Sequence, residues 1–167
     1  MSDLYSELLV KKEKTAKDSI IKYGLIALTV LFVLAGLFVT PILLIVAIAL
    51  GVVTYFVTPK TDVEYEYLFV NGEMDIDAVY AKTKRKRIKS LNLAEADLMA
   101  PVKSHRMDYY NGNQKMKILD YSSGNPEHNR FAIITRDGNE ACKIIIEPDE
   151  ALAKAMKNSA PSKVFLD

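Results

Sequence analysis

The side chains best suited to bind a ligand form a basic run that begins just after residue 80. The run places six cations within eight residues. A polybasic segment close to a cytoplasmic membrane surface gains about 1 kcal/mol per Lys or Arg from anionic lipid. The sequence therefore predicts contact with anionic lipid headgroups or with an acidic partner. The six residues are Lys82, Lys84, Arg85, Lys86, Arg87 and Lys89.

Charge pairing inside a β-sheet is a second explanation for the basic run. Only alternate side chains of a strand share a face, so about three of the six cations would reach headgroups together. The predicted hairpin that precedes the run has an acidic face, which a basic strand alongside would neutralise. The sequence leaves both explanations open. The acidic face consists of Glu64, Glu66, Glu73, Asp75 and Asp77.

Nucleic acid is not an expected partner. The chain of 167 residues has a formal net charge of +1, and no aromatic residues interleave the basic run. Binding to nucleic acid is typically accompanied by a basic patch and by aromatic platforms on which bases stack.

The remaining reactive residues do not form a catalytic or metal-binding pattern. His105 and His128 lie in predicted loops, and neither has a second ligand at the spacing that zinc sites use. Cys142 shares a strand face with Ile144 and Ile146, which predicts a small buried hydrophobe. No phosphate-binding glycine loop or nucleophile elbow occurs. We therefore predict no catalytic residues, no cofactor and no metal.

Two polar loops, residues 108–113 and 120–126, contain closely spaced Asn, Asp, Gly, Ser and Tyr residues. Loops of this kind can form a binding rim. Asn, Gly and Ser are also the residues that turns require. We attribute their composition to turns.

The longest feature of the chain is an uncharged run of 35 residues, from Tyr23 to Val57. A bilayer core needs about 20 apolar residues in a helix. The run is too long for a single span. Pro41 lacks a backbone donor and disfavours the helical conformation in the residue before it. The sequence therefore predicts two transmembrane spans, about 21–39 and 42–58, joined by a tight turn.

Lysines flank the uncharged run on both sides. The positive-inside rule then predicts a multi-pass protein of the cell inner (cytoplasmic) membrane with both termini in the cytoplasm. A hairpin that enters the bilayer and returns without crossing is an open alternative, because the second arm is short. The run contains no ionisable residue, which argues against transport. The flanking lysines are Lys11, Lys12, Lys14, Lys17, Lys22 and Lys60.

Residues 1–20 form an amphipathic N-terminal segment, in which Leu4, Tyr5, Leu8 and Leu9 recur at helical spacing. Such a segment can lie in the membrane interface with its lysines toward anionic lipid. Extension of the first span and packing on the soluble domain are the alternatives.

Residues 61–167 change to strand periodicity and predict one cytosolic domain. Apolar residues alternate on both sides of Asn71-Gly72, the strongest short hairpin signal, and pair Phe69 with Met74 and Tyr67 with Ile76. The predicted fold class is α+β: a two-helix transmembrane hairpin, then an antiparallel sheet or partly open barrel with a C-terminal helix. Further strands are predicted over 85–93, 96–102, 115–121, 130–136 and 140–147, and the helix over about 149–158.

The order of these elements resembles the pleckstrin-homology-like (PH-like) fold and the YcxB-like arrangement, in which a two-span hairpin precedes a PH-like domain. The chain also resembles an uncharacterised family of small two-span membrane proteins of Gram-positive gut bacteria. The segments that carry this resemblance are TDVEYEYLFVNGEMDID, DYYNGNQKMK, DYSSGNP and EPDEAL with APSKVFLD. The resemblance implies a fold and no particular activity.

These observations favour a non-enzymatic, membrane-anchored scaffold or lipid-proximal interaction module. Its expected partners are membrane lipids and either another protein or a second copy of the chain. The alternative is an accessory subunit of a larger membrane complex, bound through the helical hairpin.

Overall fold

The structure is a computed structural model that describes residues 5–112, 115–138 and 140–167. The chain divides into two compact units. We call residues 14–63 and 80–84 the helical unit. Residues 5–13, 64–79 and 85–167 form the β-module.

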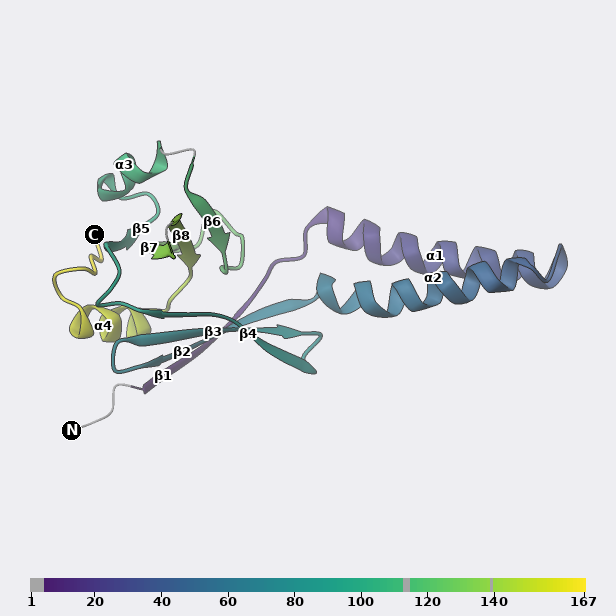
Figure 1. Cartoon of the computed structure of the whole chain (residues 1–167), viewed down its shortest axis with the longest axis horizontal. Coiled ribbons are helices and arrows are strands. Elements are labelled where there is room, and N and C mark those ends of the chain that lie inside the picture. The colour runs from purple at the N-terminus through teal and green to yellow at the C-terminus, as the bar shows by residue number, and fades with distance from the viewer. Residues whose placement is uncertain (1–4, 113–114, 139) are drawn as a thin grey trace. The chain divides into compact units, whose positions relative to one another are not determined.

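The helical unit consists of two helices joined by a tight turn at Pro41 (Figure 1). Helix α1 spans Ala16–Phe38, and α2 spans Leu43–Val57 and continues into the short helix η1, Thr58–Thr61. Helix α1 begins five residues before the predicted span because Thr15 and Asp18 form a capping box at its N-terminus. Both α1 and the segment Leu43–Thr61 are long and apolar enough to cross a membrane.

The two helices pack closely where they approach the turn. A Cβ atom added to Gly36 would lie 2.6 Å from Leu44 Cδ2, so only glycine fits there without rearrangement. Further along, the hydroxyl groups of Thr29 and Thr54 lie 3.3 Å apart. Each hydroxyl also donates to a carbonyl of its own helix, at Leu25 and Leu50.

The first sheet of the β-module has the strand order β1-β2-β3-β4. Asn71 and Gly72 join β2 to β3 with φ angles of 50° and 94°, as a two-residue type I′ turn requires. The predicted hairpin is therefore confirmed, and Tyr67, Phe69, Met74 and Ile76 are fully buried. The strands span Tyr5–Lys11, Val63–Val70, Glu73–Tyr80 and Lys84–Asn92.

The helical periodicity predicted for the N-terminal segment is wrong over residues 5–11, which form strand β1. The strand pairs antiparallel with β2, and Leu8 faces Tyr67 while Val10 faces Tyr65. This pairing satisfies the backbone groups along one edge of β2 and buries Val10. Tertiary contacts therefore override the local spacing of the leucines.

The second sheet has the strand order β5-β7-β8-β6. Strands β7 and β8 form the predicted antiparallel hairpin, although Asn139 in its turn lies outside the described residues. Strand β6 runs parallel to β8, which corrects the prediction of a wholly antiparallel sheet. The strands form two separate sheets and no closed barrel. They span Leu98–Pro101, Lys117–Asp120, Phe131–Asp137 and Glu140–Ile146.

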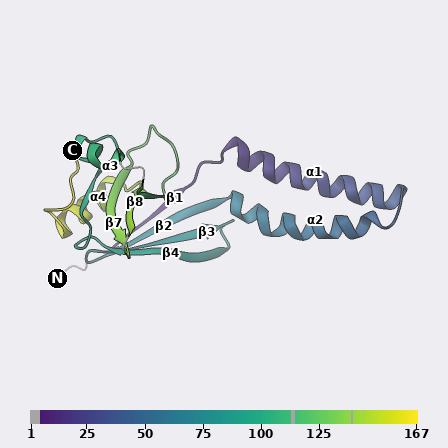
Figure 2. The same ribbon diagram turned by 45° about the horizontal axis from the view of Figure 1, so that its top comes forward.

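Strands β7 and β8 cross the strands of the first sheet (Figure 2). The short helices η2, His105–Met107, and α3, Asp108–Asn111, lie between β5 and β6 in the chain. The predicted C-terminal helix is present as α4, Glu150–Ser159, capped by Asp149. Its residues Leu152 and Met156 are fully buried. The predicted α+β class is confirmed.

Candidate functional site

The basic run lies on β4 and on the turn before it, and the alternation of the strand divides its members. Arg85 Nη2 lies 2.6 Å from Glu66 Oε1 and 2.5 Å from Glu66 Oε2. Arg87 lies over β3, with Nη2 3.0 Å from Asp75 and Nε 3.6 Å from Asp77. These two arginines therefore pair with the acidic face of the first sheet.

Two members of the acidic face, Glu66 and Asp77, are buried beneath these arginines. Glu66 is 4% exposed and Asp77 is 5% exposed. Among the described residues, Glu66 Oε2 and Asp77 Oδ1 are each close to an arginine but accept no hydrogen bond of good geometry. Burial raises the pKa of Glu66, and the positive charge of Arg85 lowers it. Glu7 of β1 lies close enough to raise that pKa further. Arg85 thus compensates a carboxylate that would otherwise be unfavourable in this position.

Lys89 pairs with the second sheet. Its Nζ lies 3.1 Å from Asp137 Oδ1 at the end of β7. A hydrogen bond from Lys89 and its charge lower the pKa of Asp137, with a smaller effect from Lys117. Arg85 and Arg87 therefore pair with the acidic face, as one of the two explanations of the basic run predicts, whereas Lys89 pairs with a carboxylate outside that face.

The other three cations of the run are Lys82, Lys84 and Lys86. All three are exposed, and none has a carboxylate within ion-pair distance among the described residues. Lys84 and Lys86 share a face of β4 because they are two residues apart. We call these three residues the free lysines.

The turn that carries Lys82 belongs to the helical unit. Ala81 and Lys82 have φ angles of 47° and 58°, a conformation that non-glycine residues rarely adopt. The Ala81 amide donates to the Asp62 carbonyl over 2.8 Å, and Lys14 pairs with the Asp62 carboxylate over 3.3 Å. These contacts hold the turn against the segments that lead into α1 and out of η1.

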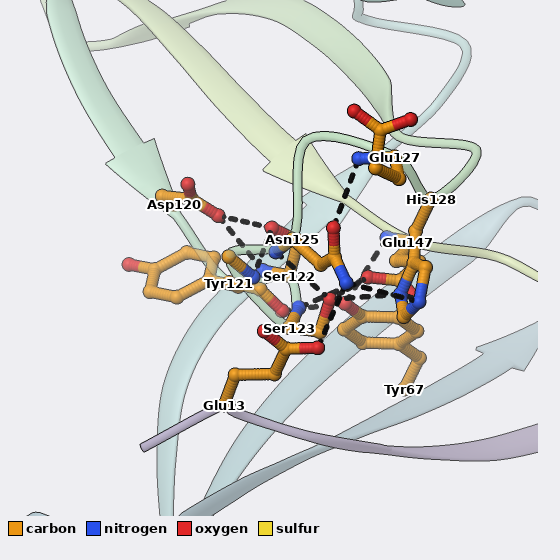
Figure 3. Close-up of polar contacts among 11 residues, drawn as sticks. Glu13, Tyr67, Asp120, Tyr121, Ser122, Ser123, Asn125, Glu127, His128 and Glu147 are labelled. Atoms are coloured by element: carbon orange, nitrogen blue, oxygen red, sulfur yellow. Dashed lines mark hydrogen bonds and ion pairs between the residues drawn. The ribbon is translucent and has the colours of Figure 1, made fainter. Parts of the chain in front are cut away.

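A second polar cluster, which the sequence analysis did not identify, contains Ser123, His128 and Glu147 (Figure 3). The Ser123 hydroxyl donates to Glu147 Oε2 over 2.5 Å, and Glu147 Oε1 lies 2.8 Å from His128 Nδ1. His128 Nδ1 also lies 3.1 Å from the serine hydroxyl. The loop composition gave no signal for this cluster, because Glu147 lies 24 residues from Ser123.

The geometry of this cluster does not suit nucleophilic catalysis. A serine nucleophile needs a base that accepts its proton, and the base needs its other nitrogen oriented by a third group. Here the serine proton is held by the carboxylate, and one histidine nitrogen faces both partners. Ser123 is also only 4% exposed. These hydrogen bonds hold the loop that carries Ser123 and His128 against Glu147.

The cluster also ties the segment after β1 to the second sheet. The Glu13 amide donates to the Ser123 carbonyl over 2.8 Å, and Asn125 donates to the Glu13 carboxylate over 2.9 Å. Tyr67 donates to the Tyr121 carbonyl and accepts from the Glu147 amide (Figure 3). Burial raises the pKa of Tyr67.

Cys142, His105 and the polar loop 108–113 are the remaining candidates that the sequence offered. Cys142 is fully buried, and burial raises the pKa of its thiol. His105 is fully exposed and lies 3.3 Å from Asp108. Residues 108–111 form α3, and the end of that loop at Asn113 lies outside the described residues.

Residues 2–166 match the family model described as Bacterial PH-like domain (DUF6106). No curated protein matches, and no solved structure matches. The family match confirms the PH-like resemblance that the order of elements suggested.

Proposed function

Because the chain belongs to the family of bacterial PH-like domains, we propose that it is a non-enzymatic interaction protein held at the cytoplasmic membrane by its helical unit. The free lysines contact anionic lipid headgroups in this proposal. The observation that carries it is the division of the basic run into three paired and three unpaired cations.

The exposure of the two long helices supports insertion into a membrane. Only 6% of the most apolar stretch of each helix is buried within the protein. A core helix of a soluble protein would bury one apolar face against the rest of the fold. Large apolar side chains such as Phe38, Ile45 and Tyr55 are instead more than 60% exposed. Lipid is the environment that such a surface fits.

The topology of the β-module supports an even number of membrane crossings. The chain leaves the first sheet after Lys11 in β1 and returns to it at Glu64 in β2, and these two residues are cross-strand partners. Everything between them, including α1 and α2, is an insertion between adjacent strands. In this proposal, both ends of the insertion therefore lie on one side of the membrane. The positive-inside rule places that side in the cytoplasm.

Exposed lysines of the helical unit support contact with anionic headgroups. The exposed Lys14, Lys17 and Lys60 flank the long helices, and the turn with Lys82 and Lys84 belongs to the same unit. Each cation near an anionic surface contributes about 1 kcal/mol. Because the paired arginines already compensate buried carboxylates, we assign the lipid contact to the free lysines.

Lysine acetylation followed by mass spectrometry tests the lipid contact on the full chain. The protein is reconstituted in nanodiscs of phosphatidylcholine alone or mixed with phosphatidylglycerol. We expect slower acetylation of Lys82, Lys84 and Lys86 in the anionic nanodiscs, and recovery at high salt because the attraction is screened. Lys103 and Lys154, exposed elsewhere in the β-module, are the controls. Equal labelling of the free lysines in both lipids would contradict the contact.

Fusions of a fluorescent protein to each terminus test the topology. We expect both fusions to fluoresce in the cytoplasm and both to stay with the membrane fraction after carbonate washing. A fusion that is accessible to protease from outside the cell membrane would contradict the proposed orientation.

The alternative role as an accessory subunit bound through the hairpin rests on two glycines. A Cβ atom added to Gly24 or Gly51 would meet nothing within 4 Å, so these positions are not used for packing inside the helical unit. Small residues allow close approach of another helix. Substitution of both by leucine should release a membrane partner in a mild-detergent pull-down if this role is correct.

A further inference from the structure

The β-module contains an open cavity of about 440 Å³ beside helix α3. It lies on the face of the second sheet that carries Ile134 and Arg136 of β7. Tyr109 and Tyr110 of α3 line it from the helix side. The volume falls within the range of about 300–1,000 Å³ that small-molecule sites occupy.

Small and apolar side chains leave this space open. Ala141 is the cross-strand partner of Arg136, and its methyl group leaves room beside the longer side chain. Met116 and Ile134, both buried, form an apolar floor. Tyr109 is 83% exposed and offers an aromatic ring at the rim. The cavity thus combines an apolar floor with polar groups from Asp97, Arg136 and the two tyrosines.

One cation lines this cavity and a second lies beside it. Arg136 is part of the lining, and among the described residues no carboxylate lies within ion-pair distance of it. Lys143 lies on the same sheet face, opposite Ile134, and is 6% exposed. Its Nζ donates to Asn111 Oδ1 of α3 over 2.5 Å. Asp97 is the one acid in the lining.

A buried ammonium with a neutral amide partner is unfavourable, because an amide compensates a lost hydration shell poorly. Burial accordingly lowers the pKa of Lys143. The described part of the chain offers this ammonium no carboxylate within 4 Å. An anion bound in the cavity would lower that cost, and the bond from Lys143 to Asn111 keeps α3 in place above it.

We propose that this cavity binds a small carboxylate carried on an apolar or aromatic group. Arg136 binds the carboxylate, and the aromatic or apolar group lies between Tyr109 and the floor formed by Met116 and Ile134. Lys143 is a positioning residue that holds α3 through Asn111 and adds positive potential. A singly charged carboxylate fits this site better than a phosphate, because Asp97 is part of the lining and would repel the higher negative charge of a phosphate.

Fluorine NMR titration tests the site with para-fluorobenzoate as the probe. The uncharged para-fluorobenzamide, which has nearly the same shape, is the control. The full chain is used in phosphatidylcholine nanodiscs, so partition into lipid is the same for every variant. We expect saturable binding of the benzoate in the millimolar range, with much weaker binding of the benzamide. Arg136→Gln should weaken benzoate binding about tenfold, whereas the exposed control Lys154→Gln should not change it.

Lys143→Met separates the proposed role from a purely structural one. We expect this variant to lose affinity for the benzoate while its thermal midpoint stays equal to or above that of the wild type, since a buried charge is replaced by an apolar chain. The proposal is overturned if no saturable binding occurs, if benzoate and benzamide bind equally, or if Arg136→Gln leaves the affinity unchanged.

Discussion

The pair formed by Arg85 and Glu66 should respond very differently to the loss of either partner. The Glu66 side chain is 6% exposed, whereas the Arg85 side chain is 55% exposed. Removal of the arginine leaves a buried carboxylate close to Glu7 and Asp77, both of which raise its pKa. Removal of the carboxylate leaves a guanidinium that can turn into water.

The exposure values give the expected magnitudes. Breaking a fully buried ion pair costs about 3–5 kcal/mol. The cost is lower for this pair, because Arg85 is half-exposed and water screens its interaction with Glu66. We expect Arg85→Gln to lower the free energy of unfolding by about 2 kcal/mol, or about 10 °C in a module of this size. Glu66→Gln should change it by no more than about 0.5 kcal/mol. The double variant should recover most of the loss.

The pH dependence follows from the raised pKa of Glu66. A carboxyl group whose pKa is higher in the folded state penalises folding when it is ionised. The penalty in Arg85→Gln should therefore be complete at neutral pH and should fade as the pH drops to the ordinary glutamate pKa of 4.5. In the wild type the charge of Arg85 lowers this pKa, so the gain in stability over the same range should be smaller than in Arg85→Gln.

Urea unfolding of the full chain in detergent, followed by circular dichroism, measures these differences. Lys86→Gln is the matched control, since this free lysine on the same strand pairs with no described carboxylate. Equal losses in Arg85→Gln and Glu66→Gln would refute the reasoning. A penalty in Arg85→Gln that persists below pH 4.5 would also refute it.

Four further predictions rest on single contacts. Tyr67→Phe should lower the free energy of unfolding by about 1–3 kcal/mol, because the Tyr121 carbonyl and the Glu147 amide lose their hydrogen-bond partner. The surface variant Tyr109→Phe should leave the free energy of unfolding unchanged in the same urea titration. Gly72→Ala should cost more than about 1 kcal/mol, because its φ is +94° and Ser159 Oγ would lie 2.8 Å from the new Cβ. Gly24→Ala should stabilise α1 by about 0.5–1 kcal/mol, whereas Gly36→Ala should not, because Leu44 occupies the space; thermal melts in detergent compare the two. Replacement of residues 12–62 by a short Gly-Ser loop should give a β-module that stays in solution after ultracentrifugation and shows a cooperative melt, whereas a chain that begins at residue 61 should not melt cooperatively.

The sequence predicted the elements whose periodicity and turn chemistry agree. The hairpin of β2 and β3 was predictable because Asn71-Gly72 fixes the register and the alternation of Tyr67, Phe69, Met74 and Ile76 selects one face. The two long helices followed from the uncharged run and from Pro41. The division of the basic run was predictable in part, because a strand places alternate side chains on opposite faces.

The contacts that the sequence did not predict all join distant segments. Leu8 and Leu9 are compatible with a helix or a strand, and only the exposed edge of β2 decides between them. The parallel pairing of β6 with β8 depends on how the chain returns after β6, which no local signal encodes. The Ser123–Glu147 bond and the bond from Lys143 to Asn111 are side-chain contacts across 24 and 32 residues.

The position of β1 decides how the two long helices are connected to the β-module. A hairpin that merely preceded a soluble domain could be exchanged or removed without affecting that domain. Here the chain forms β1 first, then the insertion with both long helices, and then β2 opposite β1, with Lys11 beside Glu64. The first sheet is incomplete until the chain has passed through the insertion. The loop from Ser123 to Asn125 then binds Glu13, the residue that leads out of β1. If the helices are anchored in the membrane as proposed, their insertion and the closure of the β-module are coupled steps, because the β-module includes segments from both sides of the helical insertion.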